Sequence, residues 1–329
     1  MLVAAACGGV RTLNEPTVPP LPQGGSATPT QVAAPAARAR IVVVTHGQAS
    51  DPFWAVVRRG VDDAAREQDV SAAYEAPDIY DVDRMRQLID AAVATHPSGL
   101  VVSLPDPQGL ASAIRKAVRE GIPVISINSG SDSFRALGIL LHVGQSEYAA
   151  GLGAGERMVA EGVRHPLCVI QEAGNIGLRE RYQGFAHAIA EAGGTPHALI
   201  VNFQNQAGAK QAMAAALRGG HIDGLLTMGA EIATPALAAL RASGMQNRIP
   251  YDTFASDSRV VLRAVLAGKI RFAVDQQPYL QGYLPIVLLG EYIRYGVLPP
   301  KGTLIPTGPM FVTKANAARV LALTKRGIR

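Results

Sequence analysis

Polar and aromatic side chains that could bind a small molecule follow the apolar runs of this 329-residue chain. The first run, "IVVVTHGQASDPFW" at 41–54, leads to an imidazole, a hydroxyl and a carboxylate, and then to a phenylalanine beside the only tryptophan. Amide, carboxylate and guanidinium groups make paired hydrogen bonds with neighbouring hydroxyls, and a flat apolar ring supports the C–H face of a sugar. The sequence therefore predicts a site for a hydroxylated ligand, formed by His46, Ser50, Asp51, Phe53, Trp54, Asp106, Asn128, Ser129, Glu172, Asn175, Arg181, Phe203, Asp257 and Gln276.

Common motifs of covalent, nucleotide-dependent and zinc-dependent catalysis are absent from the sequence. It has no G-x-S-x-G elbow, no G-x-x-x-x-G-K-[ST] loop and no H-E-x-x-H motif. "GLGAGE" at 151–156 resembles a dinucleotide fingerprint, but it follows no strong strand and is interpreted as small residues within a helix. His46 could act as a general base, yet no motif fixes a nucleophile or carboxylate beside it, which favours a residue lining a cleft. We therefore expect a binding protein that is not an enzyme and needs no metal or cofactor.

Cysteine content and charge argue against a disulfide-rich protein, a zinc protein and a nucleic-acid-binding protein. Cys7 and Cys168 are too few for a disulfide framework or a zinc site, and Cys168 lies in the apolar run "LCVIQE", which is typical of a core position. The net charge is +5, but basic residues are spread along the chain, whereas nucleic-acid binders concentrate them on one face or tail. We expect no nucleic-acid partner, and no apolar run is long enough to span a bilayer.

The N-terminal residues 1–39 predict a lipid-anchored tether. "LVAAACGG" resembles a bacterial lipobox, in which signal peptidase cuts before the cysteine, here Cys7, and the thiol carries a diacylglycerol. An accidental cysteine in an Ala-rich segment is the alternative, because the six residues before Cys7 cannot supply a basic region and an apolar region. Residues 11–40 are rich in Pro, Ala, Thr and Gly and lack apolar periodicity, as expected for an extended linker.

From residue 40 onward, short apolar runs alternate with amphipathic segments. Runs such as "IVVV" and "GLVV" lack polar alternation, which suits strands covered on both faces and hence parallel sheets with helices on either side. The alternation restarts after "LLHVG", so the chain contains two βαβ sets, each of domain size. Ligands of open parallel sheets bind at the carboxyl ends of the strands, and we expect the site between the two lobes.

Structural roles compete with ligand binding at three of these positions. Trp54 could be a staple that packs the start of a helix onto the core. Arg181 could be a surface residue paired with Glu180 or Glu191, a kind of bridge that contributes little. Asp257 could cap a helix at 258–267, with or without a second role toward the ligand. Taken one at a time, each structural role competes with the ligand-binding role. None of them explains why so many polar groups follow strands.

The chain resembles the ribose/galactose-type sugar-binding proteins of bacterial ABC importers from about residue 40 to about residue 312. The resemblance rests on "SDPFW", "EGIPVISINSG", "LRERYQGF", "FASD" and "VDQQPYLQGYLPIVLL", in this order along the chain. It implies the two-lobed type I periplasmic-binding-protein fold, α/β in class, with a parallel sheet and flanking helices in each lobe. The first lobe would comprise 40–143 plus 277–305 and the second 144–276 plus 306–329, with a hinge of three crossings.

The resemblance also implies roles for individual residues. Phe53 and Trp54 correspond to the aromatic pair of the first lobe, and Phe203 to the stacking ring of the second lobe. Arg181 corresponds to the guanidinium that bonds the sugar oxygens. Two further positions complete the implied set, the hydroxyl-binding carboxylate of Asp257 and the amide of Gln276.

The chain departs from the ribose-type pattern at two places. Asn128-Ser129 stands where those members have Asp-Arg, and Gly229 stands where they have an asparagine. His46 and the segment "EAGN" at 172–175 are candidates for replacement donors and acceptors. The pattern therefore predicts a sugar or a related polyol without specifying which one.

The implied partners are the small-molecule ligand, the permease subunits of an ABC importer and, through the lipid anchor, the membrane. We expect a monomer on the extracytoplasmic side, with ligand stabilising a closed form of the two lobes. Two alternatives share the binding fold. A ligand sensor for a chemoreceptor or kinase differs only in its partner. A lactose-repressor-like regulator would need a helix-turn-helix, which the Pro-rich residues 8–40 cannot form.

Overall fold

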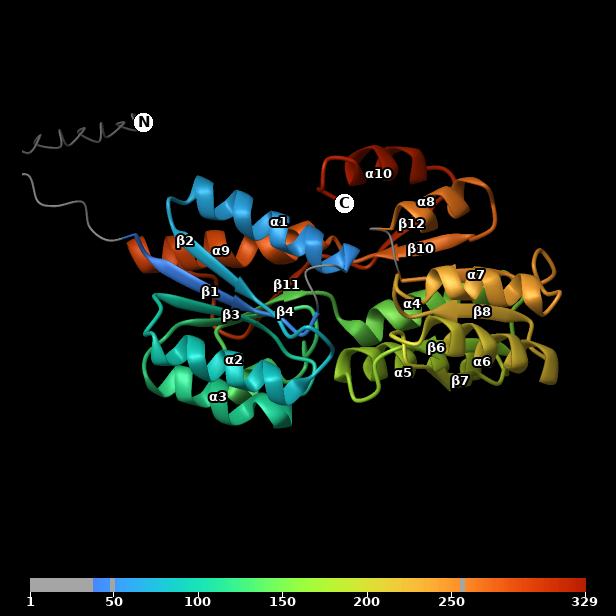
Figure 1. The fold of residues 1–329 in the computed structure, drawn as a ribbon, viewed down its shortest axis with the longest axis horizontal. Coiled ribbons are helices and arrows are strands. Elements are labelled where there is room, and N and C mark those ends of the chain that lie inside the picture. The colour runs from blue at the N-terminus through green and yellow to red at the C-terminus, as the bar shows by residue number, and fades with distance from the viewer. Residues whose placement is uncertain (1–37, 48–50, 255–257) are drawn as a thin grey trace, which may run out of the picture. The chain divides into compact units, whose positions relative to one another are not determined.

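The computed structural model describes residues 38–47, 51–254 and 258–329. Three of the predicted positions, Cys7, Ser50 and Asp257, lie outside these residues. The described part forms two six-stranded sheets, each covered by helices (Figure 1).

The first sheet consists of parallel strands only. Its members are β1 (Arg40–Val44), β2 (Ser71–Glu75), β3 (Gly99–Ser103), β4 (Val124–Ile127), β5 (Leu141–Gly144) and β11 (Thr303–Pro306). They lie in the order β11-β5-β4-β3-β1-β2, and every pair is parallel. Ile41 and Val43 point into one apolar cluster while Val42 and Val44 point into another, so the sheet is buried on both faces.

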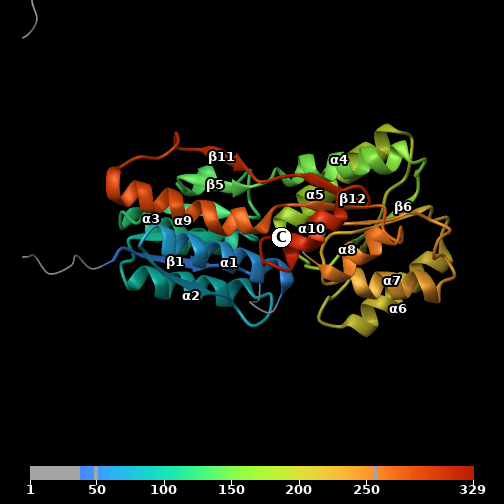
Figure 2. The ribbon, with the colours of Figure 1, turned by 90° about the horizontal axis from the view of Figure 1, so that it is seen from above.

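Two helices pack on each face of this sheet, and together with the sheet they form what we call the first lobe. They are α1 (Pro52–Glu67) and α9 (Pro278–Tyr295) on one face, with α2 (Val82–Ala94) and α3 (Pro107–Arg119) on the other. A short 3-10 helix, η1 (Phe134–Leu137), precedes β5. Figure 1 and Figure 2 both show α1 and α9 side by side.

The second sheet has the same order of elements but ends in an antiparallel strand. Its strands are β6 (Pro166–Ile170), β7 (His197–Ile200), β8 (Gly224–Thr227), β9 (Tyr251–Thr253), β10 (Phe272–Asp275) and β12 (Met310–Thr313). They lie in the order β12-β10-β9-β8-β6-β7, and only the β10–β12 pair is antiparallel.

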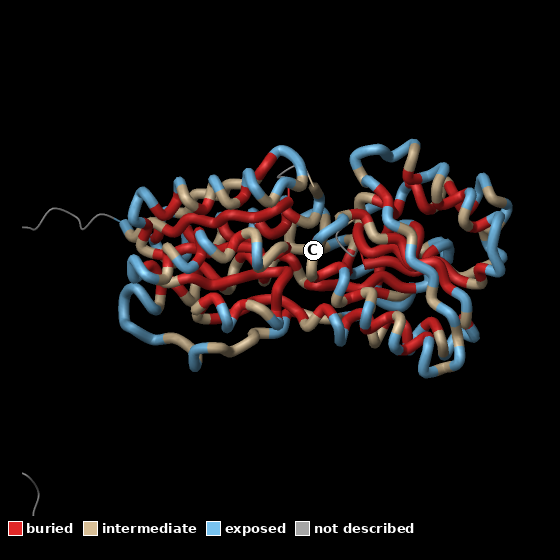
Figure 3. The backbone as a smooth tube through the Cα atoms, turned by 90° about the horizontal axis from the view of Figure 1, so that it is seen from below, coloured by how far each residue is buried: buried red, intermediate tan, exposed pale blue. Residues whose placement is uncertain are grey.

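The helices of the second sheet complete the second lobe. One apolar cluster lies under α4 (Glu147–Ala160) and α5 (Ile176–Glu191). The other lies under α6 (Gln206–Gly219), α7 (Ala233–Ala242), α8 (Arg259–Leu266) and α10 (Ala317–Thr324). Figure 3 shows the buried strands in the middle of each lobe. Cys168 on β6 is fully buried in the core, which confirms the sequence interpretation.

The chain crosses between the two lobes at three places among the described residues. It passes from β5 to α4, returns from β10 to α9, and passes again from β11 to β12. These crossings agree with the expected three-part hinge, while the residue boundaries of the lobes stay a prediction. At the second crossing Gln277 has φ 52°, a left-handed conformation that turns the chain from β10 into α9.

Close helix pairs, made possible by glycines, stabilise each lobe. A Cβ at Gly151 of α4 would lie 1.8 Å from the carbonyl oxygen of Arg181 on α5, and one at Gly184 would lie 1.9 Å from the carbonyl oxygen of Tyr148. Gly282 brings α9 equally close to α1 in the first lobe. The glycines of "GLGAGE" therefore lie within a helix, as predicted, and two of them, Gly151 and Gly155, allow the close approach of α5 to α4.

Candidate ligand-binding site

A buried ion pair between α4 and α5 forms the base of the candidate site. The Arg181 guanidinium donates through Nε to Glu147 Oε2 at 2.8 Å, and its Nη2 lies 2.7 Å from the same oxygen. The side chains are only 4% and 1% exposed, so Arg181 is not the surface residue that the structural alternative required. Burial raises the pKa of Glu147, while the charge and hydrogen bonds of Arg181 oppose the rise.

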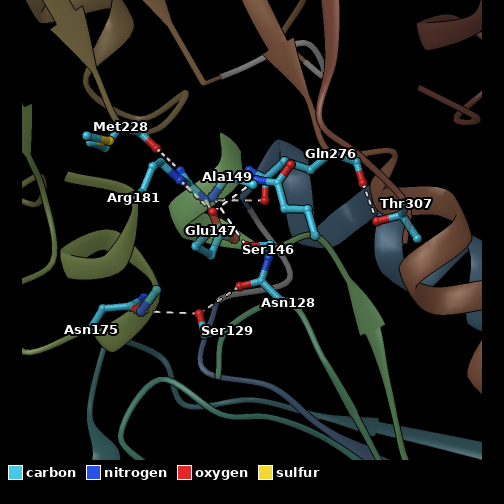
Figure 4. A network of polar contacts seen from close by, with 12 residues as sticks. Asn128, Ser129, Ser146, Glu147, Ala149, Asn175, Arg181, Met228, Gln276 and Thr307 are labelled. Carbon is cyan, nitrogen blue, oxygen red and sulfur yellow. Dashed lines mark hydrogen bonds and ion pairs between the residues drawn. The ribbon is translucent and has the colours of Figure 1, made fainter. Parts of the chain in front are cut away.

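The remaining donors of Arg181 bind other parts of the second lobe. Nη1 donates to the carbonyl oxygen of Met228 at 2.6 Å, and Nη2 donates to Gln276 Oε1 at 3.3 Å. The guanidinium carbon lies 4.3 Å from the ring centroid of Phe254. Figure 4 shows Arg181 among its polar partners Glu147, Met228 and Gln276. Since a guanidinium is planar and permanently charged, this set of partners fixes its orientation.

Hydrogen bonds join the two lobes next to this base. Ser129 Oγ at the end of β4 donates to Asn175 Oδ1 at the start of α5, at 3.2 Å. A backbone bond from Ile176 N to the carbonyl oxygen of Pro105, 2.8 Å long, also crosses between the lobes. Asn128 has φ 63°, a left-handed conformation that asparagine tolerates better than most residues. The two lobes therefore already touch through polar groups.

His46 enters the same space from the end of β1. Its Nδ1 lies 2.8 Å from Ser103 Oγ, and its ring stands edge-on to Trp54 with centroids 4.8 Å apart. Burial lowers the pKa of His46 to about 3, so the imidazole is neutral at physiological pH. Its Nε2 lies 3.4 Å from Asn175 Nδ2. A neutral imidazole in this position is available to a hydroxyl group as well as to its protein neighbours.

Aromatic rings from both lobes line the pocket beside these polar groups. Phe53 and Trp54 lie in the first turn of α1, where Asp51 caps the helix by accepting from the Phe53 amide at 2.8 Å. Trp54 is only 4% exposed and also packs in the apolar core, so the staple role and the pocket role coexist. Phe254, at the end of β9, supplies a ring from the second lobe.

An acidic side of the pocket was only partly foreseen from the sequence. Burial, followed by the charge of Glu231, raises the pKa of Glu172 to about 7. Asn175 Nδ2 donates to Glu172 Oε2 at 2.7 Å, which opposes the rise. Within the described residues, Glu231 Oε2 and Gln171 Oε1 are buried without a hydrogen-bond partner. Buried oxygens of this kind are acceptors for a ligand that carries several donors.

Nine of the predicted residues line one pocket between the lobes, which we call the inner pocket. They are His46, Phe53, Trp54, Asn128, Ser129, Glu172, Asn175, Arg181 and Gln276. Asp51 and Phe203 line neighbouring cavities instead. Asp106 caps α3 by accepting from the amides of Gln108 and Gly109.

Ser50 and Asp257 lie outside the described residues. The cap of α8 is Ser258, whose Oγ accepts from the amide of Val261. The capping role that the sequence offered for Asp257 lies outside the described residues.

Other residues that line the inner pocket were not predicted as site residues. They are Gln171, Leu178, Met228, Gly229, Ala230, Glu231 and Phe254. Gln171, Met228 and Phe254 each directly follow a strand, so the rule that selected the other candidates also reaches them. Glu231 lies farther along the loop after β8, beyond the reach of that rule.

Comparison with known proteins identifies the family. The model of the periplasmic binding protein domain matches residues 41–296. The chain belongs to this family. The match confirms the predicted type I fold and the predicted sugar-binding protein of an ABC importer, which works outside the cytoplasm.

Individual relatives agree with this assignment. The xylose/arabinose-binding protein XylF of Sulfolobus acidocaldarius is 26% identical over 293 residues, which cover 84% of this chain and 71% of XylF. The structure of a carbohydrate transporter from Acidothermus cellulolyticus in complex with myo-inositol is 35% identical, with a TM-score of 0.82, covering 89% of this chain and 100% of the other. A sugar-binding protein from Legionella pneumophila, at 24% identity and a TM-score of 0.76, shares the fold over 83% of this chain and 100% of its own.

None of the helices that the structure describes combines the length and apolar composition needed to cross a bilayer. In the same described ranges, no three side chains of His, Cys, Asp and Glu gather as ligands for a metal ion.

Proposed function

We propose that the inner pocket binds one six-membered ring with hydroxyl groups on most of its carbons, either a cyclitol or a hexose. The observation that carries the proposal is the lining of the inner pocket, which combines a fixed guanidinium, a neutral imidazole and amide groups with aromatic rings from both lobes. The polar groups would bond the hydroxyls around the edge of the ligand, while the aromatic side chains would cover the C–H faces of the ligand. The myo-inositol complex of the Acidothermus relative supports this choice of ligand.

Capture would replace contacts that the protein now makes with itself. Ser129 bonds Asn175, and Asn175 in turn bonds Glu172 and lies near His46. A ligand that enters between the lobes would take over these partners with its hydroxyls. Ligand binding would then shift the protein toward the form in which the lobes close around it, because only that form offers both sets of contacts.

The proposed activity is binding and release, without chemistry on the ligand. Ser103 is the hydroxyl that lies beside His46, and it is fully buried beneath the pocket instead of lining it. A serine in this position orients the imidazole and cannot attack a bound sugar. The purified protein should leave every ligand of the panel below chemically unchanged.

We further propose that Cys7 carries a lipid and that the mature protein is a monomer tethered by residues 7–39. The lipobox-like "LVAAACGG" and the Pro-rich segment after it support the proposal. Labelling of expressing cells with an alkyne fatty acid should mark the wild type and not the Cys7→Ser variant. Equal labelling of the two would refute the anchor, and light scattering of the soluble part tests the monomer.

A ligand panel tests the proposed function. Thermal unfolding is recorded with myo-inositol, D-glucose, D-galactose, D-allose, D-xylose, L-arabinose and D-ribose, and linear glucitol serves as the control. A ligand present at 100 times its Kd stabilises the fold by about 2.7 kcal/mol, which a melting curve resolves. We expect a six-membered cyclitol or hexose to give the largest shift and glucitol to give none. If no cyclic compound shifts the melting temperature, the proposal is wrong.

The proposed roles of individual residues are tested with the best ligand of that panel. Asn128→Ala, Gln276→Ala and Asp257→Ala should each weaken binding by about 1–3 kcal/mol, because each would leave a ligand group without its partner. Calorimetry gives the change in Kd. An unchanged Kd for any of these variants would remove that residue from the site.

A further inference from the structure

Two more cavities adjoin the inner pocket and share its walls. The first, which we call the side cavity, is lined by His46, Gly47, Asp51, Pro52, Tyr80, Glu172, Phe203 and Glu231, and it has His46, Glu172 and Glu231 in common with the inner pocket. The second, which we call the outer cavity, is lined by Tyr80, Gln171, Glu172, Ala173, Ile200, Val201, Asn202, Phe203 and Gln204. It shares Glu172 with both other spaces, and it shares Tyr80 and Phe203 with the side cavity. The three spaces are therefore parts of one cleft.

Most of the free space of this cleft lies outside the inner pocket. The outer cavity has a volume of about 350 Å³ and the side cavity about 230 Å³, compared with about 50 Å³ for the inner pocket. The inner pocket is small because polar side chains of the two lobes already touch there, as in the Ser129–Asn175 bond. The larger spaces remain although the two lobes are in contact at the inner pocket.

Two aromatic side chains, one from each lobe, line both of the additional cavities. Tyr80 belongs to the segment between β2 and α2, and Phe203 belongs to the segment between β7 and α6. The Tyr80 ring stands edge-on to the His46 ring, with centroids 5.9 Å apart. The family resemblance assigned Phe203 to stacking on the ligand from the second lobe. In the structure Phe203 lines the two additional cavities and does not line the inner pocket.

The segment that carries Phe203 is held in place by its own hydrogen bonds. Gln206 Nε2 donates to the carbonyl oxygen of Phe203 at 2.6 Å and to that of Glu231 at 3.1 Å. Asn202 Oδ1 accepts from the amide of Gln204 at 2.9 Å. A wall that is fixed before the ligand arrives loses less entropy on binding than a loose one.

Polar atoms without partners lie at the junction of these cavities. Tyr80 Oη and Gln171 Oε1 are buried and have no hydrogen-bond partner among the described residues. The Tyr80 hydroxyl can donate as well as accept, and burial followed by the charges of Glu172 and Asp106 raises its pKa, so it stays protonated. A buried hydroxyl left unpaired is costly, and a ligand hydroxyl at this point would satisfy it.

We propose that the cleft contains a second subsite, formed around Tyr80 and Phe203, that binds a second ring joined to the ring in the inner pocket. The preferred ligand would then be a glycoside, that is, a disaccharide, a glycosylated cyclitol or an aryl glycoside. The inference rests on the proposed function of the inner pocket and adds the class of ligand. Rings on both sides suit a second sugar or an aryl group, and the polar atoms at the junction suit the hydroxyls near the glycosidic bond.

Matched pairs of ligands test the second subsite. Calorimetry compares myo-inositol with galactinol, D-glucose with cellobiose, maltose and phenyl glucoside, and D-galactose with melibiose and phenyl galactoside. We expect at least one two-ring compound to bind at least 10-fold more tightly than its own single ring. The ratio of the two dissociation constants is the readout, so a general loss of folded protein does not change it.

Variants assign the gain to the subsite. Phe203→Ala should bring the ratio to within about 2-fold of one, and Tyr80→Phe should lower it by at least 3-fold through loss of the hydroxyl. Tyr292→Ala, which removes an exposed aromatic side chain of α9 that does not line these cavities, is the matched control and should keep the wild-type ratio.

Two outcomes would overturn the inference, and they are distinguishable. Single rings that bind as tightly as all their two-ring partners would exclude the second subsite and leave the proposed function intact. A protein that binds neither single nor double rings would contradict the proposed function itself. A gain that survives in Phe203→Ala and Tyr80→Phe would place the second ring elsewhere and would also refute the inference.

Discussion

Arg181 and Glu147 form an ion pair that is almost completely removed from solvent, with Nη2 and Oε2 2.7 Å apart. The two residues lie on α5 and α4, and the close approach of these helices at Gly151 and Gly184 brings them together. Arg181 therefore cannot be treated as a free guanidinium that waits for a ligand. It is a structural member of the second lobe that also lines the inner pocket.

Glu147→Gln should strongly destabilise the protein, because it leaves the buried charge of Arg181 without its counter-charge. Removing one partner of a buried pair costs about 3–5 kcal/mol. Urea unfolding measures the free energy of unfolding. The control is Glu161→Gln, which breaks the more exposed pair with Arg271 and should cost less than about 1 kcal/mol. Similar costs for the two variants would contradict the prediction.

Glu172 should make the protein less stable as pH rises from about 4.5 to about 7. Burial raises its folded-state pKa from the ordinary 4.5 to about 7, so the folded protein holds a proton that the unfolded chain releases in this window. Stability is therefore fully present below pH 4.5 and decreases through pH 7. Urea unfolding at several pH values should show a flatter profile for Glu172→Gln than for the wild type.

The part of the slope that persists in Glu172→Gln is expected from other carboxyls, among them Glu180, whose pKa is also raised to about 7 by burial and by the charges of Asp132 and Glu147. Wild-type and variant profiles that run parallel between pH 4.5 and pH 7 would show that Glu172 does not titrate there.

Two glycines of α4 should respond in opposite directions to alanine. A Cβ at Gly151 would lie 1.8 Å from the Arg181 carbonyl oxygen, so Gly151→Ala should cost at least about 1–3 kcal/mol and displace Arg181. A Cβ at Gly153 would lie 3.5 Å from the Phe311 ring, an ordinary contact. Gly153→Ala should stabilise the helix by about 0.5–1 kcal/mol. Thermal melts and ligand titrations of both variants test the contrast, which equal effects would rule out.

Ligand binding should change the fluorescence of the protein, because its only tryptophan lines the inner pocket. Trp54 is 4% exposed and touches the His46 ring, so a ligand that contacts His46 alters the surroundings of the indole. Titration with the best ligand of the panel should give a saturable change in emission. Phe53→Leu should weaken binding and keep the signal. A flat titration curve, at ligand concentrations where calorimetry shows binding, would separate Trp54 from the ligand.

Much of the fold could be predicted because local patterns decide it. The unbroken apolar run at 41–44 predicts a strand that is buried on both faces, and β1 is such a strand. Asp51-Pro52 predicts the start of a helix, and Asp51 caps α1 with Pro52 in its first turn. Pairing these strands into two separate sheets also follows from the restart of the pattern after β5.

Other elements depend on contacts that a local pattern does not contain. The amphipathic pattern predicts a helix at 179–192. The helix α5 begins earlier, at Ile176, because Asn175 accepts from the amide of Gly177 and caps it there. β11 and β12 are short segments whose strand character comes from pairing with β5 and β10, far away in the sequence.

The site shows the same division. Residues that directly follow a strand could be selected from the sequence, and nine of the predicted ones share the inner pocket. The partner of Arg181 could not be selected, because Glu147 is 34 residues away and reaches it through the packing of two helices. The sequence offered Glu180 and Glu191 as neighbours of Arg181, and neither is the partner that the structure shows.

The described partners that hold Arg181 belong to the second lobe, since Glu147 begins α4, Met228 follows β8 and Gln276 follows β10. Separation of the lobes would thus leave this charged floor whole, while the aromatic wall of α1 would move away with the first lobe. A solute that arrives would dock on the floor first and be enclosed by the wall second. Substitutions in the wall should then shorten the residence time of the solute much more than they slow its arrival.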